Sequence, residues 1–371
     1  MPNARIVIVG GGLSGLYAAC LLEQRGITDY MVLEGRARVG GRIESAAAPG
    51  LAEFDRVDLG PTWFWPGDQQ QLAALVAQLG LTSFAQHAAG DTVVERSPHD
   101  VPVRVRGDLN SPPSMRLIGG MTALVHALHR RLDRSRILCG HTVRCMRHTQ
   151  AHLEVESSDP QGRVTTWRCA HALLAVPPRL LAHAVEFVPP LPPALDQRWR
   201  ATATWMAPHA KYVAVYDTPF WRADGLSGAG RSAVGPLGEI HDACMPGGSA
   251  ALFGFLGVPA EVRHTVSPDI LRAHCRAQLA RMFGGQAAKP RAEYLKDWAL
   301  DPLTATAADV RAAGAGHHAP APDHTAATGP WNGRFTGIAS EWSPQFPGYV
   351  AGAIEAAELG VAGLPGLSDF A

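Results

Sequence analysis

The sequence lacks the features that mark several large classes of protein. No apolar run approaches the length of a membrane span, and three glycines interrupt the first apolar run before it reaches the length of a signal-peptide core. Lysine plus arginine equals aspartate plus glutamate at 33 each, so the overall charge favours neither nucleic acid nor an anionic membrane. We therefore expect a soluble, cytoplasmic protein that binds a small molecule, with no nucleic acid and no membrane among its partners.

Cysteine and metal-ligand patterns are also missing. The six cysteines include no C-x-x-C pair, which argues against a zinc ribbon or a disulfide framework and suits a reducing compartment. His126 and His129 lie one helical turn apart, and His317 and His318 are adjacent, but no matching set of carboxylates or thiolates accompanies either pair. We expect no metal site.

What is present is a globular chain that alternates strands and helices. With 371 residues, 46% apolar and 18% charged, it has the length of two or three domain-sized units. Residues 5–9 and 30–34 have the pattern of strands buried on both faces, and 16–26 that of the helix between them, which makes one βαβ unit. The rest of the pattern predicts helices at 71–80, 121–132, 268–283 and 349–360, a hairpin within 84–115, strands at 171–177, 211–216, 250–257, 292–298 and 333–339, and a long loop at 301–330.

The turn after the first strand carries a dinucleotide-binding motif. Gly10, Gly12 and Gly15 form G-x-G-x-x-G, which allows a tight turn, a close approach of the backbone to a pyrophosphate, and packing of helix on strand. The free N–H groups at the start of the helix, around Leu13 and Ser14, can bind phosphate oxygens. Glu34 ends the second strand, where a carboxylate can accept the ribose hydroxyls.

The stretch that follows, "GRARVGGR", favours FAD over NAD. Gly35, Gly40 and Gly41 keep the chain close to the ligand, and Arg36 and Arg42 can each place a forked cation near the pyrophosphate. Arg38 fits better as a solvent-exposed residue of a basic loop than as a residue that contacts the pyrophosphate.

From here the sequence resembles the flavin-dependent amine oxidases, the group of monoamine and polyamine oxidases. The stretches that carry the resemblance run in the family's order along nearly the whole chain: "VIVGGGLSGLYAACLLEQRG", "VLEGRARVGGR", "DLGPTWFWPG", "RLIGGMTALVHAL", "LLAVPP", "AKYVAVY" and "GYVAGAIEAAE". The first two are shared with wider FAD superfamilies, whereas the lysine-bearing strand and the C-terminal Gly-Tyr helix are more specific.

The resemblance implies an α/β fold with two domains. An FAD-binding Rossmann-like domain would comprise residues 1–83, 116–200 and 300–371. A smaller, discontinuous α+β substrate domain would comprise 84–115 and 201–299.

The resemblance also implies further cofactor contacts. Gly60, Pro61, Thr62 and Trp63 match the loop beside the isoalloxazine ring, and Val143 matches a valine whose backbone holds the adenine edge. Ser340 and Glu341 match a segment that reaches the ribityl and pyrophosphate groups. The helix from Val350 would point its positive end at the pyrimidine carbonyl of the flavin.

Three residues match family positions at the reaction centre. Lys211 corresponds to a lysine that contacts flavin N5 through a water and assists reaction with oxygen; the alternative is a strand-edge lysine that reaches solvent. Tyr349 matches one wall of an aromatic cage for the amine. Trp298 matches a tryptophan packed near the flavin, with a core tryptophan as its alternative.

The chain departs from the family at several places. The second cage aromatic should fall near Ala307 or Ala308, and neither is aromatic. Residues 84–115 replace a longer helical roof over the substrate. Because no cysteine follows Cys275, FAD should be bound non-covalently.

We therefore interpret the chain as an FAD-dependent amine oxidase. A hydride passes from the amine α-carbon to flavin N5, water hydrolyses the resulting imine, and oxygen reoxidises the flavin to give hydrogen peroxide. Its partners are a small-molecule amine and oxygen. Two alternatives stay open, an FAD-dependent desaturase or dehydrogenase for a bulky apolar substrate and a non-catalytic flavoprotein subunit. The sequence leaves the amine, the electron acceptor and the formation of a homo-oligomer undetermined.

Overall fold

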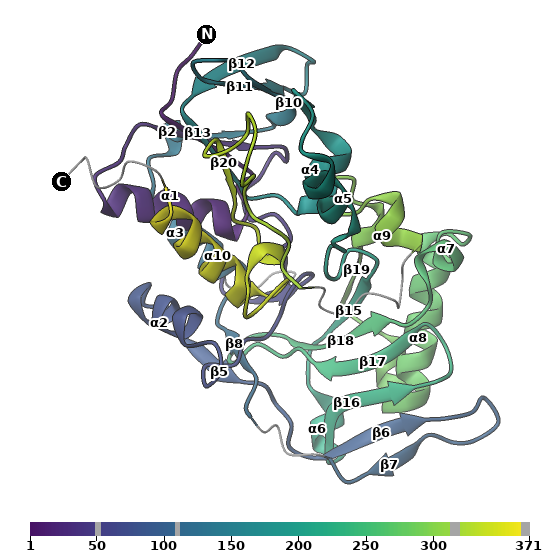
Figure 1. Ribbon diagram of the computed structural model, residues 1–371. Helices are drawn as coiled ribbons and strands as arrows, with labels where there is room; N and C mark the ends of the chain where they lie inside the picture. The colour runs from purple at the N-terminus through teal and green to yellow at the C-terminus, as the bar shows by residue number, and fades with distance from the viewer. Residues whose placement is uncertain (49–52, 108–111, 312–319, 365–371) are drawn as a thin grey trace.

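A five-stranded parallel sheet forms the centre of the nucleotide-binding half (Figure 1). The computed structural model describes residues 1–48, 53–107, 112–311 and 320–364. The strand order is β20-β13-β1-β2-β9, from β1 (Ile6–Val9), β2 (Tyr30–Glu34), β9 (Ile137–Cys139), β13 (His171–Leu174) and β20 (Phe335–Gly337). β1 and β2 pair in parallel on either side of α1 (Leu13–Gln24), which confirms the predicted βαβ unit.

Different layers cover the two faces of this sheet. Ile6 and Ile8 pack with α1, α3 (Thr122–Arg131) and α10 (Val350–Ala362). Val7 and Val9 point the other way, as alternate residues of a strand must, and pack on a four-stranded sheet. That sheet has the order β12-β11-β10-β14, from β10 (Thr142–His148), β11 (Leu153–Ser158), β12 (Val164–Cys169) and β14 (Glu186–Val188). Both faces are buried, which explains the unbroken apolar runs of the strands.

A second, seven-stranded sheet lies at the lower right of Figure 1. Its order is β19-β15-β18-β17-β16-β6-β7, from β6 (Asp91–Glu95), β7 (Val103–Val105), β15 (Ala210–Tyr216), β16 (Leu226–Ser232), β17 (Leu237–Asp242), β18 (Ala250–Leu256) and β19 (Ala292–Asp297). The predicted hairpin within 84–115 is β6 and β7, and it extends this sheet. The predicted domain limits stay a prediction.

The two faces of the second sheet also pack against different parts of the chain. Tyr212, Ala214 and Tyr216 pack on α8 (Pro268–Phe283). Ser267 begins that helix by accepting a hydrogen bond from the Ile270 N–H, with a proline at the first helical position. Lys211, Val213 and Val215 lie on the opposite face, where Val213 and Val215 pack against Val57 and Leu59 of the nucleotide-binding half.

The remaining helices and strands are short. They are α2 (Gln70–Gln78), α4 (Pro178–Ala184), α5 (Pro193–Ala201), α6 (Phe220–Ala223), α7 (Ala260–Arg263), β3 (Ser45–Ala47), β4 (Arg56–Asp58), β5 (Ser83–Ala85) and β8 (Met115–Leu117). The prediction of a loop over 301–330 is wrong at α9 (Ala307–Arg311), a short helix that begins with Thr306 bonded to Asp309. Residues 312–319, including His317 and His318, lie outside the described residues.

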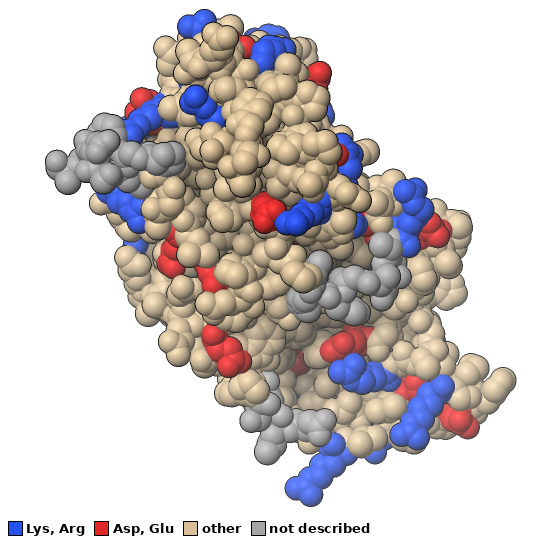
Figure 2. All heavy atoms as spheres, in the orientation of Figure 1, with Lys and Arg blue, Asp and Glu red and all other residues tan. Residues whose placement is uncertain are grey.

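The described helices, surface and side-chain clusters add three observations. None of these helices is long and apolar enough to cross a membrane. Acidic and basic side chains are interspersed over the face drawn in Figure 2, most of which is uncharged. Within the described ranges, no group of three or more histidine, cysteine or carboxylate side chains comes together as a metal site would require.

Phe335 provides a test of the core. Its side chain is fully buried and contacts the rings of Phe187, Trp199 and Trp331. Because Phe335→Ala removes no polar partner and leaves a cavity, we expect the free energy of unfolding to fall by about 3–5 kcal/mol. Denaturant unfolding measures this loss. Val164→Ala, at an exposed position, is the control and should change stability by less than about 0.5 kcal/mol. Equal effects for the two variants would contradict the packing described here.

Candidate functional site

The glycine turn after β1 lies at one end of a large cavity. A Cβ on Gly10, whose φ is +107°, would lie 2.8 Å from the Ala175 carbonyl oxygen, and one on Gly15 would lie 2.0 Å from the Gly10 oxygen. These two positions therefore exclude larger residues for reasons of packing. Gly12 differs, because a Cβ there would meet no atom within 4 Å, and its backbone is extended with φ −71°. Gly12 lies beside open space at the start of α1.

Glu34 is held firmly beside this turn. Its carboxylate is buried and accepts backbone N–H groups from Gly11 and Arg36, each at 2.7 Å. Each carboxylate oxygen has a second lone pair, so the side chain can still accept hydroxyl groups from the cavity that it lines.

The arginines of "GRARVGGR" are all paired with carboxylates. Arg36 binds Asp301 at 2.9 and 3.0 Å, Arg38 contacts Glu44, and Arg42 binds Glu341 at 2.6 and 3.0 Å. Arg36 and Arg42 also line the cavity. Their position near a pyrophosphate stays a prediction. Nothing in the sequence marked Asp301 or Glu341 as their partners, because neither is near in the chain.

Lys211 is buried at the other end of the cavity. Its Nζ donates to the Thr62 hydroxyl at 2.6 Å and to the Gly60 carbonyl at 3.1 Å, and lies 3.9 Å from the centre of the Phe253 ring. β15 is flanked by β18 and β19, and Lys211 is only 2% exposed, so it does not reach solvent as a strand-edge lysine would.

Burial lowers the pKa of Lys211 to about 7. The carboxylate of Asp58 opposes this shift, and the guanidinium of Arg116 adds to it. Asp58 is itself buried, with Oδ1 accepting Ser45 Oγ and the Met121 N–H while Oδ2 has no hydrogen-bond partner. Burial raises the pKa of this carboxyl, and Lys211 lowers it.

Aromatic side chains surround the same end of the cavity. Tyr349 precedes α10, and its ring lies 6.4 Å from that of Trp65 and 6.3 Å from that of Trp205. Trp298 donates its indole N–H to the Leu59 carbonyl at 3.1 Å, with the ammonium of Lys296 4.3 Å from the ring centre. Ala307 and Ala308, where the second cage aromatic is missing, do not line the cavity.

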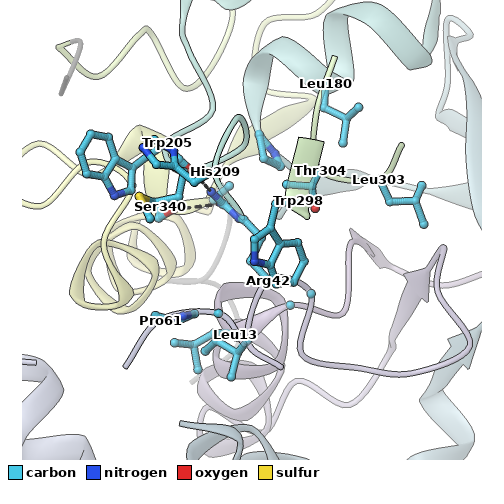
Figure 3. A pocket seen from close by; sticks show the side chains of 18 of the residues that line it. Leu13, Arg42, Pro61, Leu180, Trp205, His209, Trp298, Leu303, Thr304 and Ser340 are labelled. Carbon is cyan, nitrogen blue, oxygen red and sulfur yellow. Dashed lines mark hydrogen bonds between the residues drawn. The ribbon is translucent and has the colours of Figure 1, made fainter. Parts of the chain in front are cut away.

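The cavity has a volume of about 1020 Å³ and joins residues from distant segments. All the predicted site residues line it except Gly15, which packs behind the turn, and Glu341, which binds Arg42. Figure 3 shows the convergence in one view, with Leu13 and Pro61 at the bottom, Trp205, His209 and Ser340 at the upper left, and Leu180, Leu303 and Thr304 at the upper right. The sequence did not predict Leu180, Leu303 and Thr304 as part of the site. It did not predict Trp205, His209 and Glu239 either, because no motif marks any of these residues.

A smaller cavity of about 270 Å³ adjoins the Lys211 end. Trp63, Trp65 and Glu239 line both cavities. Glu239 contacts His241 at 2.7 Å and Arg231 at 3.5 Å, and the hydrogen bond from His241 lowers the pKa of its carboxyl. The combined space is thus apolar and aromatic near Lys211 and polar beyond it.

Fold and cavity together define an FAD-type dinucleotide-binding protein with a second sheet closing the Lys211 end of the cavity. The residues fit that cofactor: Gly12 leaves room beside the helix start, Glu34 presents a carboxylate, and the described residues that line the cavity include no cysteine, in keeping with non-covalent binding.

Comparisons with known proteins identify the family. The model of the flavin containing amine oxidoreductases matches residues 104–362, and that of the NAD(P)-binding Rossmann-like domain matches residues 8–79. Putrescine oxidase of Kocuria rosea is 24% identical over 81% of this chain and 83% of its own. In three dimensions the chain is similar to a double mutant of putrescine oxidase, with a TM-score of 0.78, 21% identity, and 98% and 99% of the two chains covered. Cyclohexylamine oxidase from Brevibacterium oxydans IH-35A gives the same TM-score at 19% identity, covering 99% of each chain.

Because the family model matches well over half of the chain, the protein belongs to the flavin-containing amine oxidoreductases. It is an FAD-dependent oxidoreductase acting on CH–NH bonds.

Gly12 offers a test of the cofactor cavity that does not depend on turnover. Gly12→Val adds a side chain whose Cβ meets no protein atom within 4 Å and which projects into the space predicted for the pyrophosphate, so the protein should fold and lose at least about 1.4 kcal/mol, or tenfold, in FAD affinity. FAD titration of the apoprotein measures this affinity. The matched control is Gly67→Val, where a Cβ likewise meets nothing within 4 Å and the residue does not line the cavity. Unchanged FAD binding in Gly12→Val would refute the placement.

Proposed function

We propose that this protein oxidises an amine at its α-carbon to an imine, which water then hydrolyses to an aldehyde or ketone. When bound, FAD would supply the redox chemistry, as the acceptor of a hydride from the amine and the donor of electrons to oxygen, which becomes hydrogen peroxide. The observation that carries the proposal is a buried lysine beside an aromatic-walled space, in the same cavity as the dinucleotide turn.

The nucleotide end of the cavity holds the cofactor in this proposal. The turn at Gly10–Gly15 and the start of α1 bind the pyrophosphate, aided by Arg36 and Arg42. Glu34 accepts the ribose hydroxyls. The Val143 backbone borders the adenine.

The other end positions the reacting groups. The Gly60–Trp63 loop and Trp298 would border the flavin ring, and the N-terminus of α10 at Val350 would stabilise negative charge on it. Tyr349 steers the neutral amine, because the flat face of its ring limits the orientations that the amine can adopt. No side chain need act as a strong base, because the amine reacts in its deprotonated form.

Glu239 supports a substrate with a second polar or cationic group. It is the carboxylate shared by the two cavities, beyond the aromatic residues at the Lys211 end. An amine whose far end carries an ammonium group would find a charge partner there.

The direct test supplies a panel of monoamines and diamines to the FAD-loaded protein in air. We expect a carbonyl product and hydrogen peroxide in equal amounts from at least one amine. A carbon–carbon double bond in a product that keeps its nitrogen would instead support the desaturase alternative. FAD that no substrate reduces, under anaerobic conditions, would contradict any catalytic role.

The protonation of Lys211 should set the pH dependence of reaction with oxygen. A cation near the flavin stabilises charge that develops on oxygen, and Lys211 loses its proton as pH rises through its pKa of about 7. The reoxidation rate should therefore fall across that range. Lys211→Met should remove this step and slow reoxidation by roughly 10²-fold, with much less effect on flavin reduction.

Asp58→Asn tests the cause of that pH dependence. Because the Asp58 carboxylate raises the pKa of Lys211, its removal should move the fall in reoxidation rate to lower pH. Stopped-flow reoxidation over a pH series gives the midpoint. Asp196→Asn, in an exposed ion pair with Arg200, should leave the midpoint unchanged. A shift to higher pH in Asp58→Asn, or equal slowing of reduction and reoxidation in Lys211→Met, would count against this role.

A further inference from the structure

We infer that Trp205 forms the second aromatic wall of the amine site, opposite Tyr349, in place of the aromatic missing at Ala307 and Ala308. The inference rests on the proposed function and names the residue that completes its substrate site. Trp205 lies in the segment between α5 and β15, far in the sequence from both alanines.

The geometry of the rings supports this assignment. Trp205 and Tyr349 both line the large cavity, with ring centres 6.3 Å apart and planes inclined by only 31°. Trp65 meets Tyr349 edge-on, at 86°, so it closes one side of Tyr349 and presents no parallel face. A nearly parallel pair of rings is the arrangement that can hold a flat or extended amine between two faces.

The gap between the rings must widen slightly for a substrate. Two carbon contacts of about 3.5–4.0 Å each need ring faces roughly 7–8 Å apart, which is more than the 6.3 Å between the two ring centres. Rotation of the Trp205 side chain can provide this opening while its backbone stays fixed.

Several contacts fix that backbone. Arg42 Nη1 donates to the Trp205 carbonyl at 3.5 Å, and the neighbouring Thr204 N–H donates to Asp309 at 3.0 Å. A Cβ on Gly348, next to Tyr349, would lie 2.5 Å from the Trp205 Cβ. Only glycine at position 348 lets the tryptophan pack this close to Tyr349.

The segment of Ala307 and Ala308, which carries no cage aromatic, holds the chain next to Trp205 in place. Asp309 belongs to α9, which begins at Ala307, and is 2% exposed. Its carboxylate accepts Arg179 Nη1 at 2.6 Å, and Arg179 also donates to the carbonyls of Arg200 and Ala201. The buried Arg179–Asp309 pair thus joins α9 to the chain just before Trp205, which makes Asp309 a positioning residue for the wall.

The test compares FAD-loaded Trp205→Ala, Trp205→Phe and wild type. Anaerobic flavin reduction is followed against the concentration of the best amine of the panel, which separates the dissociation constant from the limiting rate. Binding without turnover is measured from the flavin absorption spectrum with 2-phenylpropan-2-amine, which has no hydrogen on its α-carbon. We expect Trp205→Ala to weaken binding about tenfold or more, and Trp205→Phe to stay within about threefold of wild type, with FAD content unchanged.

Asp309→Asn tests the support of the wall. It keeps an acceptor for the Thr204 N–H but removes the charge paired with Arg179, so the dissociation constant should rise more than the limiting rate falls. Arg198→Gln, which breaks an exposed ion pair with Asp323 nearby, is the matched control and should change neither.

The outcomes separate the two proposals. Wild-type affinity in a folded, FAD-loaded Trp205→Ala variant would overturn the role of Trp205 and leave amine oxidation standing. A wild-type protein that no amine reduces would overturn the proposed function and, with it, this inference. Wild-type affinity in Asp309→Asn would overturn the positioning role alone.

Discussion

The buried ammonium group of Lys211 is the constraint on which the aromatic end of the cavity depends. It links the seven-stranded sheet to the Gly60–Thr62 loop of the nucleotide-binding half through two hydrogen bonds. A buried charge is costly, so the surroundings must supply acceptors and a counter-charge, and Thr62, Gly60 and Asp58 provide them. The same arrangement leaves the pKa of the lysine near neutrality, where its charge responds to pH and to neighbours.

The nucleotide-binding half could be predicted from sequence because its determinants are local. The alternation of apolar strand, glycine turn and apolar helix specifies β1, α1 and β2. The hairpin of β6 and β7 was visible as a pattern, yet its pairing with β16 depends on contacts more than a hundred residues apart. The prediction of a loop over 301–330 does not include α9. This short helix is stabilised by Asp309 and its distant partner Arg179.

The candidate site divides in the same way. The glycines and Glu34 are recognisable because a tight strand-to-helix turn and a carboxylate at the end of the second strand form a motif of fixed spacing. Lys211 is singled out only by the resemblance to the amine oxidases. The carboxylate partners of Arg36 and Arg42, the carboxylate of Glu239 between two cavities, and the ring of Trp205 carry no such signature. They become functional candidates only when distant segments meet, which the sequence pattern does not encode. The sequence predicts an incomplete aromatic cage, because neither Ala307 nor Ala308 is aromatic. The inferred aromatic pair is instead Tyr349 with Trp205, which come from different segments of the chain.

The central claim is that one cavity brings FAD, the Lys211 ammonium and the amine together in a fixed order. A crystal structure of the protein with FAD and 2-phenylpropan-2-amine tests it most directly. The account predicts the dinucleotide along Gly12 and Glu34, the flavin ring between Lys211 and the N-terminus of α10, and the amine between Tyr349 and Trp205. A flavin ring outside this cavity, or an amine bound away from both aromatic faces, would contradict it.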